Sequence, residues 1–498
     1  MVNILDSIYA KFEGVIEIIN GLKLANMKKL ILFLNLISLF NWSCTDVNND
    51  INLSENNDIV LESNPIAILK KNDFKISNEN AKKQLELYMN YVEPQTRSGC
   101  NIQIIDDGKI SYPLTSVTRS IGRETIGVYK YVLSSKDSKG FALVCDDLRQ
   151  PGILAYCPEG SLNDTLFNEG LAQYMRKLPQ IISHKIDETM EIWSDQQINK
   201  KIANKQLKTL TTRNTIWGGG ENLPPDSNDT INGGPIYMPQ YDGTRTSGDT
   251  TFVFNNFRLY ISHIANRDFR VPVNWGQNDP YNKDVPYQCG AGKAPAGCVA
   301  VAIAQIMAYH KYPSNYNWDI LVQSPTISST SVTDEARRNE VARLIADIGR
   351  KVNMNYDCSG SGATISKAND ALKSYGYKTK GVMDYYLFTT IYYECYCDYF
   401  NPAYFKGPFY FRGSNSNGEG HAFVVDGIFE YFPVILYDYE EWVNGVKIVS
   451  EPRAMLFVIF NTAADFHINW GWNGSSNGYF AQENLDFNDE RKLIKVDL

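Results

Sequence analysis

One stretch of the sequence, residues 298–310 (CVAVAIAQIMAYH), constrains the fold more than any other. Its apolar positions do not leave a polar face, and a helix that is apolar all round has to be buried. Pro313 ends the pattern, and Gly297 before it leaves room for another segment to approach closely. The sequence therefore predicts a fold built around this helix, with Cys298 at its first turn.

A cysteine at the start of a buried helix lies where unpaired N–H groups and the helix dipole favour an anion. This environment lowers the pKa of a thiol and increases its thiolate fraction. Buried cysteines are nevertheless more often inert core residues. A nucleophilic role for Cys298 therefore requires a base and an orienting group elsewhere in the chain.

Among the five histidines, His421 is the best candidate for that base. It begins the run HAFVVDG, which predicts a short apolar strand with a turn at its Asp-Gly pair, and Gly420 leaves space beside the ring. His310 lies 12 residues beyond Cys298 on the same helix. At about 1.5 Å per residue it is roughly 18 Å away and cannot reach the sulfur.

Two further segments offer the supporting groups. In HINWGWNG, Asn469 is predicted to accept the imidazole N–H while the neighbouring indoles shield that bond. His467 could be structural. The alternative for the whole segment is a tryptophan-rich turn packed on a core. In NWGQNDPYN, Gln277 can donate its amide to a developing oxyanion beside the backbone N–H of Cys298. Taken singly, a glutamine in a turn indicates very little.

Together these segments resemble the streptopain family of papain-like cysteine peptidases, the streptococcal exotoxin-B type. The order Gln, Cys, His, Asn is that of papain-like enzymes, and QNDPYN, AGCVAVAIAQIMAYHKYP, GHAFVVDG and HINWGWNG are similar to the family's own motifs. The resemblance implies an α+β fold with a helical lobe and an antiparallel sheet lobe, preceded by an α+β propeptide domain. It implies no metal or organic cofactor.

The resemblance also implies a role for each matching residue. These roles are Cys298 as nucleophile, His421 as general base and acid, Gln277 in the oxyanion hole, Asn469 and Trp470 as orienting and shielding groups, Trp472 as support, and Ser361 and Gly420 in the substrate cleft. Two departures stand out. Arg412-Gly413 replaces the toxin's Gln-Gly pair, and the stretch between Asp426 and His467 is longer, which predicts an extended hairpin with its turn at NGVKI.

The sequence near the N-terminus predicts export. Residues 27–44, MKKLILFLNLISLFNWSC, carry two lysines, an apolar stretch and a final cysteine, which is the layout of a bacterial secretory signal starting at Met27. Its apolar part is too short to span a membrane, and a buried core helix is the alternative. Cys44 is the expected lipidation site. Asn41 and Trp42 depart from the small residues preferred there, so secretion without an anchor stays open.

The order of segments predicts a preproenzyme. We expect a signal in residues 1–44, a polar tether in 45–64, an inhibitory propeptide domain in 65–213, a flexible maturation linker in 214–249 and the peptidase domain in 250–498. KGFALVCDDLRQPGILAYCPEG resembles the family's propeptide and predicts two strands around a solvated acidic turn at Asp146-Asp147. Pro179 is expected to break the following helix. Residues 217–249, dense in Gly, Pro and Asn, are expected to be exposed and easily cut.

The composition of the chain limits the classes of molecule that it is expected to bind. The net charge is −8 and no basic block is present, which argues against nucleic acid. Nine cysteines without metal-finger spacing leave one or two disulfides open. The expected partners are protein or peptide substrates and the chain's own propeptide. The alternatives are a catalytically silent surface binding protein on the same fold and an acyl transferase with the same nucleophile.

Overall fold

The computed structural model describes the chain in eleven stretches, all within one compact unit, Ile59–Leu498. These are residues 74–92, 102–113, 125–136, 138–150, 152–194, 236–268, 270–384, 407–414, 420–456, 463–481 and 490–498. The predicted signal, the lipidation site Cys44 and the polar tether lie outside the described residues, as does most of the predicted linker.

A large antiparallel sheet is the framework of the described unit, and fourteen of the described strands belong to it. Its main path runs β1 (Gln103–Pro113), β2 (Thr125–Ser134), β3 (Lys139–Cys145), β4 (Ile153–Cys157), β15 (Gly478–Ala481), β14 (Ala463–Asn469), β12 (Gly420–Val443), β11 (Phe409–Ser414), β16 (Glu490–Asp497) and β10 (Lys378–Asp384). The joint between β4 and β15 pairs Tyr156 with Tyr479 and Ala155 with Phe480. The predicted propeptide and peptidase regions therefore share one continuous sheet.

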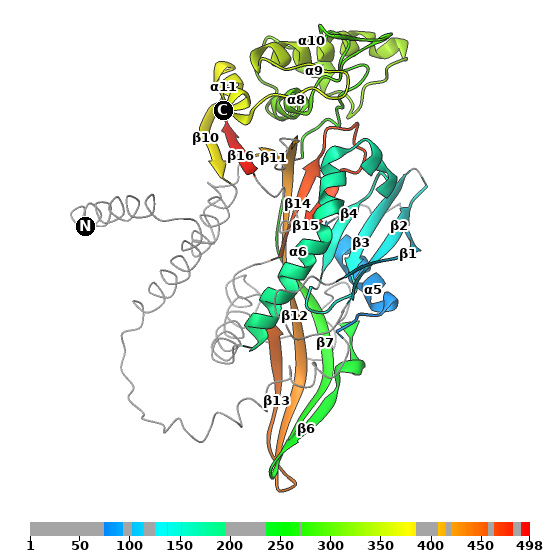
Figure 1. Ribbon diagram of the computed structural model, residues 1–498, viewed down its shortest axis with the longest axis vertical. Coiled ribbons are helices and arrows are strands. Elements are labelled where there is room, and N and C mark those ends of the chain that lie inside the picture. The colour runs from blue at the N-terminus through cyan, green and yellow to red at the C-terminus, as the bar shows by residue number, and fades with distance from the viewer. Residues whose placement is uncertain are drawn as a thin grey trace, which may run out of the picture. The chain divides into compact units, whose positions relative to one another are not determined.

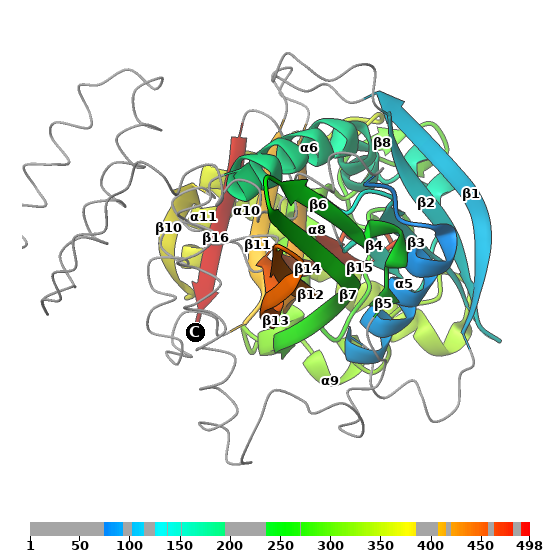
Figure 2. The ribbon, with the colours of Figure 1, turned by 90° about the horizontal axis from the view of Figure 1, so that it is seen from below.

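Four helices gather at the β10–β16–β11 end of the sheet: α8 (Cys298–His310), α9 (Trp318–Leu321), α10 (Glu335–Lys351) and α11 (Ile365–Ser374) (Figure 1). Viewed from below, β10, β16 and β11 lie side by side beneath them (Figure 2). Every residue of α8 from Val299 to Ala308 is buried, as its all-round apolar pattern predicts. This helix is the centre of a core that also takes in α10, α11 and residues of β11, β12 and β16.

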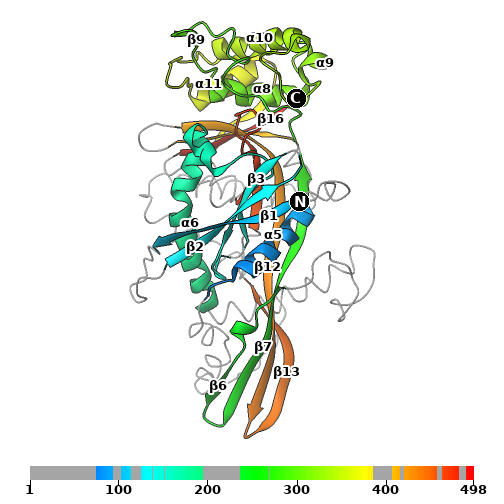
Figure 3. The same ribbon diagram turned by 90° about the vertical axis from the view of Figure 1, so that its right-hand side faces the viewer.

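Two helices from the N-terminal part cover opposite faces of the sheet (Figure 3). Helix α5 (Asn78–Val92) packs with Phe429 and Tyr479 on one face, and α6 (Glu169–Ser194) packs with β11, β12 and β14 on the other. A short 3₁₀ turn, η2 (Leu162–Leu166), precedes α6. The predicted break at Pro179 is wrong, because α6 continues through it.

The acidic pair after β3 also differs from expectation. The sequence predicts a solvated turn, but Asp146 and Asp147 are buried. Asp146 pairs with Lys75 and Lys109, and Asp147 pairs with Arg149. Buried carboxylates require such partners, and the Lys75 partner comes from a segment about seventy residues earlier that the local pattern does not reveal.

A long ribbon extends the sheet at the end opposite the four helices (Figure 1). It combines β12 with β13 (Val446–Leu456) and β7 (Thr250–Asp268), and β12 turns into β13 through Asn444 and Gly445, which both have positive φ. The predicted extended hairpin is thus confirmed, with the turn chemistry that its Asn-Gly pair indicates.

The last part of the predicted linker belongs to this ribbon. Residues 236–247 form β5 (Ile236–Tyr237), η3 (Pro239–Tyr241) and β6 (Gly243–Ser247), and both strands pair with β7. Ile236, Met238 and Tyr241 are buried. The expectation that this stretch buries no core is therefore wrong from residue 236 onward, because pairing with β7 supplies the partners that the local composition does not. The other predicted domain boundaries remain predictions.

The architecture is the expected α+β class, with a helical part and an antiparallel sheet part. None of the helices in the described stretches is long and apolar enough to cross a membrane. One small separate hairpin, β8 (Gln288–Cys289) with β9 (Gly292–Lys293), precedes α8, and a 3₁₀ turn, η4 (Val332–Asp334), precedes α10.

Candidate active site

Cys298 is the first residue of α8, as the sequence predicts. Gly297 caps the helix with φ 92°, a backbone conformation that favours glycine. A Cβ on Gly297 would lie 2.8 Å from Met354 Cε and 3.0 Å from the Ser361 carbonyl oxygen. Glycine is therefore needed here both for its conformation and for close packing, and the packing brings Ser361 beside the cysteine segment.

His421 lies on β12, next to Cys298. Burial raises the pKa of the Cys298 thiol, but hydrogen bonding to His421 and the positive charge of its ring outweigh burial and hold that pKa below its ordinary value. The Ala422 backbone and the charge of Arg412 act in the same direction. Two side chains 123 positions apart in the sequence thus form one interacting pair.

The imidazole of His421 shows the matching shift. Burial lowers its pKa, but hydrogen bonding to Cys298, the charge of the thiolate and the Trp470 carbonyl together hold that pKa above its ordinary value. Nε2 lies 2.8 Å from the Trp470 carbonyl oxygen. Because a carbonyl can only accept, Nε2 carries a hydrogen and Nδ1 is the ring atom left to exchange a proton with the thiol. A thiolate–imidazolium pair is therefore favoured.

Asn469 does not make the hydrogen bond that its motif predicts. Its Oδ1 accepts from Gln305 Nε2 at 2.9 Å and from the Gly471 N–H at 3.1 Å, and its Nδ2 donates to the Val273 carbonyl at 3.0 Å. Side chains alternate along β14, and Ile468 and Trp470 belong to the cluster on the His421 side of the sheet. Asn469 therefore faces the other way and connects the Trp470 loop to α8.

The indoles surround the imidazole. Trp470 is fully buried, with its ring centre 6.2 Å from that of His421. Trp472 stacks on His421 with the ring planes 9° apart and the centres separated by 6.4 Å. Both contacts keep water away from the ring, which strengthens its hydrogen bond to the Trp470 carbonyl.

The remaining predicted residues lie around the same pair. Gln277 is buried, and its carbonyl accepts the Ala296 N–H at 2.8 Å, which fixes its segment against the chain just before Cys298. Gly420 directly precedes His421 on β12 and pairs with Ser414 of β11. The structure thus brings all eight predicted peptidase-site residues to one region. Arg412 was noted in the sequence only as a departure from the toxin's motif, so its charge beside Cys298 was missed.

Comparisons with known proteins match two regions of the chain. The Peptidase C10 family model matches residues 275–315 and 314–480, and the Spi protease inhibitor model matches residues 74–182. Streptopain from Streptococcus pyogenes is 26% identical over 255 residues, which cover 43% of this chain and 54% of that protein. The thiol protease/hemagglutinin PrtT of Porphyromonas gingivalis is 24% identical over 249 residues, 42% of this chain and 23% of that protein.

The chain is thus similar to streptopain-type cysteine peptidases over residues 275–480 and to a protease inhibitor family over residues 74–182. It spans about half the length of the curated streptopains that it matches. Among solved structures, a Prevotella intermedia prointerpain A fragment matches with 18% identity over 79% of this chain and 98% of that chain, at a TM-score of 0.40. Active interpain A matches with 24% identity over 47% of this chain and 96% of that chain, at a TM-score of 0.32.

The region that matches the inhibitor model, residues 74–182, is called the inhibitor-like region here, and it includes the start of α6. The start of α6 covers the histidine side of the site. A Cβ on Gly170 would lie 2.3 Å from Trp470 Cε3 and 2.9 Å from His421 Cδ2. Phe167 contacts the Trp472 ring edge to face at 6.0 Å. The negative charge of Glu169 also helps to hold the pKa of His421 above its ordinary value. These contacts join residues about 250 positions or more apart and were not predicted.

A polar contact next to this cover holds the two regions together. Asp164 is buried, and its Oδ2 accepts from the Ser161 N–H at 3.0 Å and from Ser476 Oγ at 2.7 Å, and also from Ser475 Oγ. The Ser476 N–H donates to the Glu159 carbonyl at 3.0 Å. The loop after the tryptophans is therefore bonded to the η2 turn of the inhibitor-like region.

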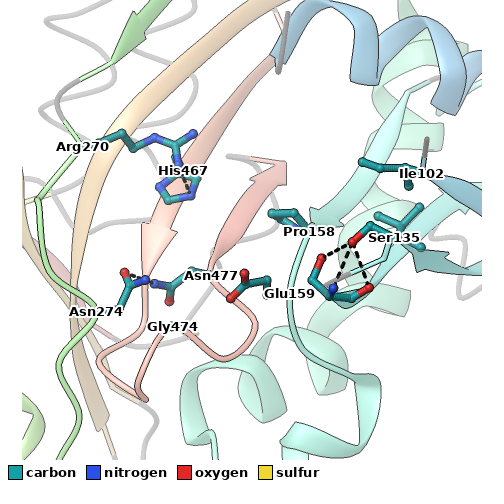
Figure 4. Close-up of a pocket in the computed structure, with 11 residues that line it drawn as sticks. Ile102, Ser135, Pro158, Glu159, Arg270, Asn274, His467, Gly474 and Asn477 are labelled. Carbon is teal, nitrogen blue, oxygen red and sulfur yellow. Dashed lines mark hydrogen bonds between the residues drawn. The ribbon is translucent and has the colours of Figure 1, made fainter. Parts of the chain in front are cut away.

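His467, which begins the HINWGWNG segment and is also buried, is structural. Nδ1 donates to Asp426 Oδ1 at 2.5 Å, and Nε2 accepts from Arg270 Nη1 at 2.7 Å. Burial, followed by the charge of Arg270, lowers the pKa of His467 despite the nearby carboxylate of Asp426. With both nitrogens engaged, His467 is not available as a base. It lines a cavity of about 270 Å³ between residues of the two regions (Figure 4).

Proposed function

We propose that this chain is a cysteine endopeptidase made as an inactive zymogen. The observation that carries the proposal is the Cys298–His421 pair, whose pKa values are shifted toward a thiolate and an imidazolium. The match of residues 275–480 to the Peptidase C10 family and the similarity to streptopain support the same reaction. A protein or peptide is the proposed substrate, because a thiolate paired with an imidazolium can attack the carbonyl carbon of a peptide bond.

In the proposed first step, the Cys298 thiolate attacks the carbonyl carbon of the scissile peptide bond. The negative charge moves to the carbonyl oxygen, where the Gln277 amide and the Cys298 N–H stabilise it. Cys298 is the first residue of α8, so its N–H has no acceptor within the helix. His421 then donates its proton from Nδ1 to the leaving nitrogen, the C–N bond breaks, and a thioester remains.

In the second step, water attacks the thioester while His421 Nδ1 takes one of its protons. The C–S bond breaks, the new carboxylic acid leaves and loses its proton to solvent, and the thiolate–imidazolium pair is restored. Trp470 positions His421 through its carbonyl and shields the ring, and Trp472 supports it from one face. Asn469 is proposed to act indirectly, by fixing the backbone that carries that carbonyl. Ser361 and Gly420 are proposed to line the substrate cleft.

The inhibitor-like region is proposed to keep the enzyme inactive until it is cut away. The contacts of Phe167, Glu169 and Gly170 with the histidine side support this role. Because Ile236, Met238 and Tyr241 are buried in the ribbon, the activating cut is expected before residue 236. Residues 217–235, the part of the easily cut stretch 217–249 that precedes residue 236, are the proposed location.

An extracytoplasmic location is also proposed. The signal-like segment at residues 27–44 motivates it. The disulfide Cys289–Cys358 supports it, since disulfides persist mainly in oxidising compartments. Lipid attachment at Cys44 is the proposed anchor. Mass analysis of the Cys44-bearing product from cells would test both the lipid and the location.

The decisive experiment compares wild type with Cys298→Ala in the full chain. Wild type should hydrolyse casein, bind a thiol-reactive probe at Cys298, and yield a product with a new N-terminus within 217–235. The variant should do none of these while keeping its unfolding transition, because a small side chain is lost at a partly exposed position. Casein hydrolysis by the variant would end the proposal. Wild type that stays inactive after removal of the inhibitor-like region would favour a silent binding protein.

A further inference from the structure

A disulfide bridge joins two segments on either side of the nucleophile. Cys289 and Cys358 are bonded with their Cα atoms 5.5 Å apart and 69 positions between them in sequence. The first belongs to the β8–β9 hairpin and the second to the loop between α10 and α11. Neither has a role in the proposed mechanism, which uses Cys298 alone. The bridge therefore needs its own explanation.

The Cys289 hairpin leads directly into the nucleophile. Cys289 pairs with Gly292 across the hairpin, and the Ala294 N–H donates to the Tyr287 carbonyl at 3.0 Å. Two residues later the Ala296 N–H donates to the Gln277 carbonyl at 2.8 Å. Cys298 follows as the first residue of α8. The hairpin is thus fixed to both the nucleophile and the proposed oxyanion-hole segment.

The Cys358 loop reaches the nucleophile from the other side. Its ends are joined by backbone hydrogen bonds between Asn355 and Gly362, at 2.9 and 3.0 Å. Inside it, the Ser361 carbonyl lies against Gly297, where a Cβ would be only 3.0 Å from the oxygen. The loop therefore forms one wall beside Cys298, at the place where Ser361 is proposed to meet substrate.

The outer part of this loop is exposed, and its Ser359 N–H and Gly360 N–H donate within the loop, to Asp357 Oδ1 at 2.8 Å and to the Asp357 carbonyl at 3.3 Å. Its sequence from Cys358 to Gly362 is CSGSG, and residues 357–360 are exposed. Neither Gly360 nor Gly362 has an atom within 4 Å of the place where a Cβ would stand. Glycine- and serine-rich segments have many accessible conformations. The internal hydrogen bonds shape the loop, and the covalent bond attaches it to the Cys289 hairpin.

We propose that the Cys289–Cys358 bridge is a positioning element for substrate binding, which holds the 355–362 wall of the cleft against the Cys298 segment. This inference rests on the proposed peptidase function. It gives the enzyme two opposite redox requirements, because Cys298 has to be a thiol while Cys289 and Cys358 have to stay oxidised. A loosened wall has to be ordered again when substrate binds, which weakens binding without altering the reacting groups.

Reduction of the bridge needs an external dithiol. One dithiol molecule transfers two electrons and two protons, the Cys289–Cys358 bond breaks to give two thiols, and the dithiol becomes its cyclic disulfide. The same reagent restores a Cys298 that has been oxidised to a mixed disulfide. Mild reductant is therefore expected to activate the enzyme, and strong reductant is expected to weaken its binding of substrate.

The test compares the full chain of wild type with Cys289→Ser/Cys358→Ser, which leaves no unpaired thiol behind. After activation, kcat and KM are measured on an internally quenched peptide, and amide hydrogen exchange is measured over residues 355–362. The double variant is expected to raise KM about three- to tenfold with kcat within about twofold, since only ordering of the wall is lost. Exchange in 355–362 should become faster while that of α8 stays unchanged.

A matched control changes a different exposed side chain of the peptidase region. Ser329 is exposed and lies outside the 355–362 loop, so Ser329→Ala should leave KM and the exchange of 355–362 unchanged. If the double variant does not fold, folded wild type is reduced stepwise with dithiothreitol and the bridge is followed by mass. A KM that rises with the reduced fraction supports the proposal.

Two outcomes separate this inference from the proposed function. Unchanged KM together with unchanged exchange, in the double variant or the fully reduced wild type, would overturn the positioning role and leave the peptidase intact. Wild type without Cys298-dependent hydrolysis would overturn the peptidase function and the role in substrate binding. In that case the exchange measurement still decides whether the bridge fixes the loop.

Discussion

The cysteine side and the histidine side of the site are built from different parts of the chain. Cys298 and the segments against it, including Gln277 and Ser361, all lie between residues 274 and 362, and a disulfide closes this group. His421 lies in the middle of the large sheet, and the inhibitor-like region covers it through Gly170. The pKa of Cys298 is therefore set mainly by contacts within the peptidase region, whereas access to the site is proposed to depend on the inhibitor-like region.

The largest effect in this comparison is expected from His421→Asn. Loss of the base and acid should lower kcat/KM by about 10²–10⁴-fold. It should also raise the pKa of Cys298, because His421 is the main influence that lowers it. The pH dependence of iodoacetamide labelling at Cys298 measures that shift. His310→Gln is the matched control, since His310 lies at the far end of the same helix.

The directions of these two pKa shifts predict how activity depends on pH. In wild type the thiolate is lost as pH falls through the lowered pKa of Cys298, and the imidazolium is lost as pH rises through the raised pKa of His421. Activity should therefore be greatest between these two values, where more of the enzyme carries the thiolate–imidazolium pair than the ordinary pKa values would give. In His421→Asn the labelling curve should move to higher pH. A curve that stays in place would show that the two groups do not interact.

The same two sides differ in how far the sequence predicts them. The cysteine side follows from local patterns: an all-apolar helix, a glycine before it and a cysteine at its first turn. His421 could be proposed from its strand pattern, but the cover by Phe167 and Gly170 joins positions about 250 or more apart. Contacts of this kind depend on how strands β4 and β15 pair, which no local pattern contains.

Asn469 and the ribbon show two other reasons why local patterns fail. The motif places an asparagine next to a tryptophan, but alternation along β14 turns the Asn469 side chain away, and a main-chain carbonyl takes its place at His421. A hydrogen bond to a main-chain carbonyl cannot be predicted from the residue types of a motif, because every residue has that carbonyl. In the ribbon, Ile236 and Tyr241 are buried by pairing with β7 and by contacts with the N-terminal part, which overrides a composition typical of loops.

An intermediate effect is expected from Gly170→Ala, which tests only how the start of α6 covers the histidine side of the site. The added Cβ would lie 2.3 Å from the Trp470 ring, where flanking aromatic residues leave no room. Overpacking of this kind costs about 1–3 kcal/mol. The start of α6 should therefore separate more readily from His421, and the uncut variant should label faster at Cys298 than uncut wild type.

The control for this change is Gln180→Ala, at an exposed position on the same helix. It should leave the labelling rate of the uncut chain unchanged. Once the inhibitor-like region has been removed, Gly170→Ala and wild type should hydrolyse peptides at the same rate, because the substituted residue is gone. Equal labelling of uncut Gly170→Ala and wild type would mean that α6 does not limit access to the site.

The smallest effect on reactivity is expected from Asn469→Ala, although its effect on stability is clear. The change removes the acceptor of the Gly471 N–H and the donor to the Val273 carbonyl, both buried, so the free energy of unfolding should fall by about 1–3 kcal/mol. Because Asn469 does not contact the imidazole, the pH curve of Cys298 labelling should stay where it is in wild type. Asn469→Asp keeps an acceptor for Gly471 and Gln305 and should recover part of the lost stability. A labelling curve shifted as far as in His421→Asn would instead mean that the amide contacts the ring in the active enzyme, and that the cysteine and histidine sides rearrange when the inhibitor-like region leaves.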